Sequence, residues 1–424
     1  MRNMETQLFT ELRPLYETTK ENPHVIRLKI RMKDMIDSDV LCHAVDITMR
    51  RYPYLCVELT KKDGQYIFID NDRPVVITNS LRGVDLNSPE ANYHVIAFVY
   101  EDDWLALDVF HGITDGTGSY EVLKTLLYYY CTERYNVALN TNGVRLEEDD
   151  IRPEEWEEPV ANRKDLPKPE KLQQPDALNL VTMAGLENDK QNTVYSIVID
   201  ETEYMDFVKE NGGSPTTMTS LLLSRAISKM YPDAEQVIRM MVCVNQRNAL
   251  KVPMARHSLV GGASLEYNDN MSSLPIDEQV GIYRKLLKKQ TTDEEVLKGV
   301  ASQRELYNIF LSKETDQERT ELAKMLGDVT IRVTTSTVSY VGKTDFNGTE
   351  RYIRDFRTLT CPPPSGLGVE LAAVGKRFTI DFIQTFSSDI YVNAFLKELE
   401  ENNIKYELQE VSGLELPEFK HPWD

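Results

Sequence analysis

The segment that most limits the fold of this chain runs from Leu105 to Gly118. It is an apolar, strand-like stretch followed by a histidine, a glycine-rich turn and an amphipathic helix. Residues 104–111 and an earlier apolar run, 93–100, are separated by only three acidic residues, which predicts a β-hairpin. Apolar side chains between Leu123 and Tyr130 recur with the i, i+3, i+4 and i+7 spacing of one buried helix face. The sequence therefore places His111 where a core strand gives way to a loop and a helix.

The turn itself has the pattern His111-x-x-x-Asp115-Gly116. Gly112, Gly116 and Gly118 give its backbone the freedom to bend sharply. A histidine mounted in this way can reach a cleft and take a proton from a bound nucleophile. The alternative is a satisfied core histidine, with Asp115 capping the following helix. The spacing alone favours that alternative, whereas the strand–turn–helix context favours a functional histidine.

Composition limits the classes of protein that fit. The 424 residues are 41% hydrophobic, enough for two domains and a large core, and they contain no long apolar run. Because the first residues lack a charged and then apolar pattern, we expect no amino-terminal signal. The five cysteines are scattered without C-x-x-C spacing, as expected for thiols of a cytosolic protein. We therefore expect a cytoplasmic protein without a membrane span.

The net charge of −20 argues against non-specific binding to nucleic acid or to an anionic membrane. It leaves room for an anionic co-substrate, because a small basic patch is enough to bind one. Arg351, Arg354 and Arg357 form one basic cluster, although a solvated helix or loop face is the favoured interpretation of these residues. The six histidines are dispersed, so we expect no metal site and no permanently bound cofactor.

An acidic and then proline-rich segment divides the chain between about 140 and 179. We place a first domain at 1–150, a linker at 151–180 and a second domain at 181–424. The acidic run 147–158 is interpreted as a solvated face of the linker. The expected helices are 38–52, 217–230, 276–290, 316–326 and 389–401; the expected strands are 25–32, 66–70, 193–199, 237–244, 329–341 and the hairpin 369–374 with 377–382.

Several motifs now follow one another along the chain. In order, they are Arg50-Arg-Tyr-Pro-Tyr-Leu55, Phe110-His111-x-x-x-Asp115-Gly116, Val244-Asn-Gln-Arg247, Leu259-Val-Gly-Gly262 and Ser339-Tyr-Val-Gly342. Together they resemble the chloramphenicol-acetyltransferase-like superfamily of acyltransferases, which includes alcohol acetyltransferases and peptide-synthetase condensation domains. The resemblance implies an α/β fold of two similar domains, each a mixed sheet with helices, and an active-site channel between them.

The resemblance also implies residue roles. His111 matches the general base, and Asp115 and Gly116 match the structural end of the motif, with Arg247 as the ionic partner of Asp115. Ser339 matches a small hydroxyl near the channel that could donate to the oxyanion; the alternative is an ordinary hydroxyl of a β-strand. Many relatives carry two adjacent histidines, whereas Phe110 occupies the first position here. This departure argues mildly against a role in peptide condensation.

The leading hypothesis is an enzyme that transfers an acyl group, acetyl or another short one, from coenzyme A to an alcohol or amine. The acyl-CoA is a co-substrate, the acceptor is a small molecule, and a monomer is expected. One alternative is transfer from the phosphopantetheine arm of a carrier protein; another is a catalytically silent binding module on the same fold. A serine-hydrolase mechanism is disfavoured because the chain has no Gly-x-Ser-x-Gly elbow.

Overall fold

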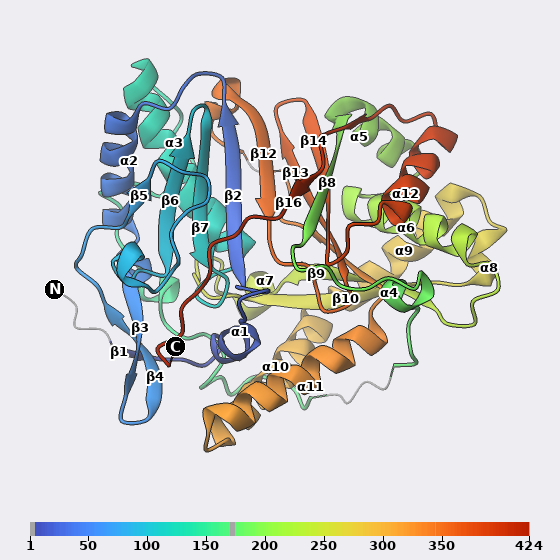
Figure 1. Ribbon diagram of the computed structural model, residues 1–424, viewed down its shortest axis with the longest axis horizontal. Coiled ribbons are helices and arrows are strands. Elements are labelled where there is room, and N and C mark those ends of the chain that lie inside the picture. The colour runs from blue at the N-terminus through green and yellow to red at the C-terminus, as the bar shows by residue number, and fades with distance from the viewer. Residues whose placement is uncertain (1–4, 170–173, 344, 424) are drawn as a thin grey trace.

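The computed structural model describes residues 5–169, 174–343 and 345–423. Two large sheets stand side by side, with most of the helices on their outer sides (Figure 1). The first is five-stranded, in the order β12-β2-β7-β6-β5. Its strands are β2 (Val25–Met32), β5 (Ile77–Thr78), β6 (Ile96–Glu101), β7 (Trp104–Phe110) and β12 (Ile353–Leu359). The predicted hairpin is confirmed, since β6 and β7 pair antiparallel from Glu101 opposite Trp104.

The second sheet is eight-stranded, in the order β10-β9-β11-β13-β14-β8-β15, with β16 also on β8. Its strands are β8 (Thr193–Asp200), β9 (Ile238–Asn245), β10 (Val260–Tyr267), β11 (Ser336–Tyr340), β13 (Leu367–Val374), β14 (Arg377–Gln384), β15 (Glu407–Leu408) and β16 (Ser412–Gly413). The predicted hairpin of β13 and β14 is confirmed. A small third sheet contains β1 (Glu5–Gln7), β3 (Val57–Lys62) and β4 (Gln65–Asp70).

The helices cover the outer faces of the two large sheets (Figure 1). Beside the first sheet lie α2 (Ser38–Arg51) and α3 (Gly116–Tyr135). Around the second lie α5 (Glu201–Glu210), α6 (Pro215–Met230), α9 (Ile276–Gln290) and α12 (Ile390–Glu401). The remaining helices are α1 (Leu12–Glu17), α4 (Leu180–Met183), α7 (Arg247–Leu250), α8 (Asp269–Ser272), α10 (Asp293–Ser312) and α11 (Asp316–Val333). Each large sheet therefore has its own apolar core, with helices on the outside.

One predicted strand is wrong in part. The run 329–341 was expected to be a strand, but α11 continues to Val333 and β11 begins only at Ser336. β-Branched residues lower helix propensity only slightly, so a helix already formed extends through them. That helix starts from a capping box at Thr315 and Glu318. The long helix α10 and the shorter α5 were not predicted.

The two halves are tied together more closely than a simple division at 151–180 implies. β12 comes from the second half of the chain but pairs with β2 in the first sheet. The carboxyl-terminal segment also returns to the first half, where Phe419 stacks on Phe110 with ring centroids 4.0 Å apart. The residues of the predicted linker are described except for 170–173, which lie outside the described residues.

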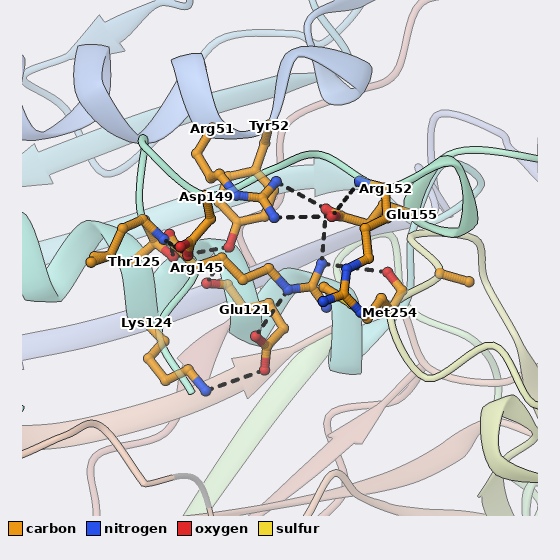
Figure 2. A network of polar contacts seen from close by, with 12 residues as sticks. Arg51, Tyr52, Glu121, Lys124, Thr125, Arg145, Asp149, Arg152, Glu155 and Met254 are labelled. Atoms are coloured by element: carbon orange, nitrogen blue, oxygen red, sulfur yellow. Dashed lines mark hydrogen bonds and ion pairs between the residues drawn. The ribbon is translucent and has the colours of Figure 1, made fainter. Parts of the chain in front are cut away.

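The acidic run is not entirely solvated, which corrects the prediction for Glu155. This side chain is buried, and Figure 2 shows it surrounded by donors from several elements. Its carboxylate accepts hydrogen bonds from Arg51 Nη1 and Nη2 at 2.9 and 3.0 Å, and from Tyr54 Oη at 2.7 Å. Arg145 Nη1 lies 3.4 Å from Glu155 Oε2 and 3.4 Å from Met254 O in the second half. The Glu155 carboxylate can be buried because it is paired with two arginines and a tyrosine hydroxyl.

Candidate active site

Backbone hydrogen bonds fix His111 directly after the last residue of β7. Its N–H donates to His24 O over 2.7 Å, and the Ile113 N–H donates to Phe110 O over 3.1 Å. Gly112 is needed in this turn because a Cβ there would lie 2.2 Å from the Phe110 ring. The structure therefore contains the tight turn that the sequence predicts.

Asp115 ends the turn and caps α3. Its Oδ1 accepts from the Gly118 N–H over 3.1 Å, and its Oδ2 accepts from the Leu259 N–H over 2.9 Å. Arg247 completes the arrangement from the other half of the chain, with Nη1 2.8 Å from Oδ2 and Nη2 2.9 Å from Oδ1. The two residues are 1% and 2% exposed. The predicted ion pair is present, and it joins the histidine turn to the second sheet.

Arg247 is itself held in place by backbone oxygens. Its Nε donates to Ala255 O over 2.9 Å, and its Nη2 donates to His257 O over 2.8 Å. These bonds matter because a buried guanidinium is costly unless its donors are satisfied. Gly116 brings the same two regions together, since a Cβ at this position would lie 2.8 Å from Val341 Cγ2.

A cavity of about 220 Å³ lies beside His111, and both halves of the chain line it. The imidazole is half-buried, so it is neither sealed in the core nor fully exposed. The lining side chains that matter for chemistry are His111 and Thr117 from the first half and Cys243, Ser339, Glu370 and Cys361 from the second. The predicted candidates His111, Asp115, Gly116 and Ser339 thus border one cavity, and Arg247 lies behind it.

Glu370 is a site residue that the sequence reasoning missed. It lies on β13 opposite Ser339 of β11, and the Ser339 hydroxyl is hydrogen-bonded to its carboxyl. Burial, together with the charge of Asp381, raises the pKa of Glu370 to about 8. The available signal was a lone carboxyl residue in an otherwise apolar strand, Leu367–Val374.

Two further side chains near His111 stay neutral. Burial and, to a smaller extent, the neighbouring charge of His111 lower the pKa of His24 to about 3, so this imidazole is uncharged at neutral pH. Burial raises the pKa of Cys243 to about 12, which keeps its thiol protonated. Neither group therefore competes with His111 as a base near neutral pH.

Phe110, the residue before His111, is buried and stacks on Phe419. Its side chain packs in the core of the first half and lines no part of the cavity beside His111. The predicted basic cluster needs a correction at Arg357, which lies half-buried on β12 and contacts Asp355 and Ser196.

Among the described residues, one cluster has the side chains of a metal site: Glu11, Glu158 and His257. His257 Nδ1 lies 3.2 Å from Glu11 Oε1, and Arg256 Nη1 lies 3.4 Å from the same oxygen. The charges of His257 and Arg256 help to lower the pKa of Glu11 to about 2 against the opposing effect of burial. These contacts account for the cluster as an ion-pair network.

The fold is shared with several solved structures of low sequence identity. TRI101 of F. sporotrichioides, solved with coenzyme A and T-2, is 10% identical; the match covers 95% of this chain and 99% of that one, with a TM-score of 0.60. Polyketide synthase associated protein 5 from Mycobacterium tuberculosis is 14% identical over 93% and 96% of the two chains, with a TM-score of 0.59. The first condensation domain of the CDA synthetase is 12% identical over 94% and 95%, with a TM-score of 0.56.

This chain has the acyltransferase and condensation-domain fold. The resemblance in the sequence motifs is confirmed at the level of the fold, along nearly the whole chain. No protein-family model and no curated protein matches the sequence. In the part of the chain that the structure describes, no helix is both long enough and apolar enough to cross a membrane.

Proposed function

We propose that the protein transfers an acyl group from coenzyme A to a small alcohol or amine, with His111 as the general base. The observation that carries this proposal is the position of His111, which borders a cavity lined by both halves of a fold found in coenzyme A complexes. The braced turn supports it, because a base must be held in a fixed orientation to act efficiently. Asp115 and Arg247 supply that bracing and do not touch the reacting atoms.

The chemistry follows from the groups around the cavity. His111 removes the proton of the acceptor hydroxyl or amine as the acceptor oxygen or nitrogen attacks the thioester carbonyl carbon. A tetrahedral intermediate forms, and the Ser339 hydroxyl on the cavity wall donates to the oxyanion when it turns away from Glu370. The intermediate collapses with cleavage of the C–S bond, and the proton on His111 passes to the leaving thiolate.

The test is release of free thiol from acetyl-CoA and longer acyl-CoAs in the presence of a panel of alcohols and amines. We expect His111→Ala to lower turnover by at least about 10²-fold, the typical contribution of general-base catalysis. Thermal unfolding should change little, because a half-buried cavity side chain contributes little packing. His43→Ala is the matched control, since His43 is exposed on α2 and pairs with Glu133.

Equal rates for wild type and His111→Ala would remove His111 as the base. A wild-type protein that neither binds nor turns over acyl-CoA would contradict the choice of donor. The structural likeness to condensation domains then directs the next assay to a thioester on the phosphopantetheine arm of a carrier protein. A protein inactive with both donors would be a binding module on this fold.

A further inference from the structure

A row of polar side chains crosses the eight-stranded sheet, and one end of this row lines the cavity. Ser339 lies opposite Glu370, Glu370 opposite Asp381, and Asp381 opposite Ser196. Cys243 extends the row on β9, where its thiol is hydrogen-bonded to Ser339. The other face of the same strands packs into the apolar core of the second half. Ser196 and Asp381 are buried and the other members are half-buried, so the polar groups of this row need partners.

At the Asp381 end of the row the protein supplies a positive charge and a partner for Asp381 Oδ1, although Asp381 Oδ2 accepts no hydrogen bond from the described residues. Ser196 Oγ donates to Asp381 Oδ1, and Arg357 Nη1 donates to the same Ser196 hydroxyl over 2.6 Å. Arg357 Nε also lies 3.1 Å from Asp355 Oδ2. The nearby guanidinium compensates this part of the row, and Asp381 lines no part of the cavity.

The Glu370 end has no such compensation. Glu370 lines the cavity with His111, and its hydrogen-bond partner is the neutral Ser339 hydroxyl. No lysine or arginine is among the described residues that line this cavity. The other carboxylate on the cavity wall, Asp115, is already paired with Arg247. Glu370 therefore presents a carboxyl group to the cavity without a cation from the protein.

We infer that Glu370 is a specificity-determining residue that binds a basic amine of the acceptor, so that the acceptors are amino alcohols or diamines. This inference rests on the proposed function. With a pKa of about 8, Glu370 is mostly protonated at neutral pH, and a bound ammonium group would stabilise its ionised form through a charge-assisted hydrogen bond. Neither the thioester nor the phosphates of an acyl-CoA carry such a cation. The net charge of −20 also favours encounters with cationic molecules.

The reacting group of such an acceptor is its second functional group. The ammonium stays on Glu370, while the hydroxyl or the neutral second amine gives its proton to His111 and attacks the thioester. The alternative ligand is a purely neutral acceptor whose oxygen accepts a hydrogen bond from protonated Glu370. These two possibilities predict opposite preferences between acceptors that differ only in an amine.

The experiment compares kcat/KM for isosteric acceptors with acetyl-CoA as donor: aminopropanol against butanol, and aminopentanol against hexanol. Wild type should prefer the amino alcohol by about tenfold or more, as a buried charge-assisted bond allows. Glu370→Gln keeps the size of the side chain but should bring the ratio close to one. Glu370→Asp keeps the charge and should retain part of the preference. Glu407→Gln, at an exposed position on β15, removes the same charge from the same sheet and should keep the wild-type ratio.

A wild-type preference for the neutral alcohols would overturn the inference, as would a preference that survives Glu370→Gln. An equal loss in Glu407→Gln would also overturn it, because long-range charge would then explain the effect. If wild type turns over no acceptor, the proposed function fails, and calorimetric titration with diaminopentane tests Glu370 separately. Binding that is lost in Glu370→Gln but kept in Glu407→Gln supports the inference; equal binding by all three proteins, or none by wild type, overturns it.

Discussion

The ion pair between Asp115 and Arg247 gives a prediction whose size can be worked out from the structure. We consider Arg247→Met, which keeps an unbranched chain of similar length but removes the charge and all donors. The substitution leaves the carboxylate of Asp115 with only two backbone partners, Gly118 N–H and Leu259 N–H. It also leaves the carbonyl oxygens of Ala255 and His257 without the guanidinium.

Removing one partner of a buried ion pair typically costs about 3–5 kcal/mol, because a desolvated charge is left uncompensated. A domain of ordinary stability has about 5–15 kcal/mol in total, so the loss is a large fraction of it. Adding Asp115→Asn to Arg247→Met should restore part of the loss, because the uncompensated charge is then gone. The double variant should therefore be less destabilised than the sum of the two single variants.

Urea unfolding followed by circular dichroism measures the stability, and thiol release measures activity at a urea concentration where each variant is folded. Arg27→Met is the matched control, because Arg27 and Asp108 form an equally buried pair at 2.6 and 2.7 Å within the first sheet. We expect both arginine variants to be destabilised, but only Arg247→Met to lose activity per folded molecule. A cost below about 1 kcal/mol for Arg247→Met, a value typical of exposed pairs, would refute this reasoning.

Two further predictions concern the same region. Because the pKa of Glu370 is raised from 4.5 to about 8, its neutral form stabilises the fold at low pH, and this contribution is lost as pH rises between these values. The unfolding free energy of wild type relative to Glu370→Gln should therefore fall over that window, by at most about 1.4 kcal/mol per pH unit. A difference that does not change with pH would contradict the raised pKa of this carboxyl. Gly118→Ala would place a Cβ 2.0 Å from Thr114 Oγ1 and 3.2 Å from Arg256 O, so we expect a loss of about 1–3 kcal/mol by denaturant unfolding in spite of the better helix propensity of alanine.

The parts of the fold that the sequence predicts well are those set by neighbouring residues. The hairpin of β6 and β7 and the turn at His111 depend on alternation, short connections and glycines within one segment. The pairing of Asp115 with Arg247 joins residues 132 positions apart, and only the resemblance of motifs indicated it. Local sequence patterns do not indicate which residues so far apart in the chain will pair, because the tertiary fold determines the partner.

The features that the sequence did not predict also depend on residues from distant segments. The burial of Glu155 depends on Arg51 and Arg145, which lie on other segments, so the acidic composition alone suggested a solvated face. Arg357 was assigned to a solvated face because its strand has no apolar alternation strong enough to show that β12 joins the first sheet. Glu370 was visible as a lone charge in an apolar strand, but its importance follows only once the cavity beside His111 is known.

The pairing of β12 with β2 also constrains the order in which the molecule can be completed during its synthesis. β2 leaves the ribosome long before β12 exists, so one edge of the first sheet remains open while most of the second half is translated. Open strand edges invite association with other chains, and lysine or arginine on the edge discourages it. β2 carries Arg27, Lys29 and Arg31 at alternate positions. Arg27 is neutralised by Asp108 on β7, so Lys29 and Arg31 are the residues that discourage association of the nascent first half until its last strand arrives.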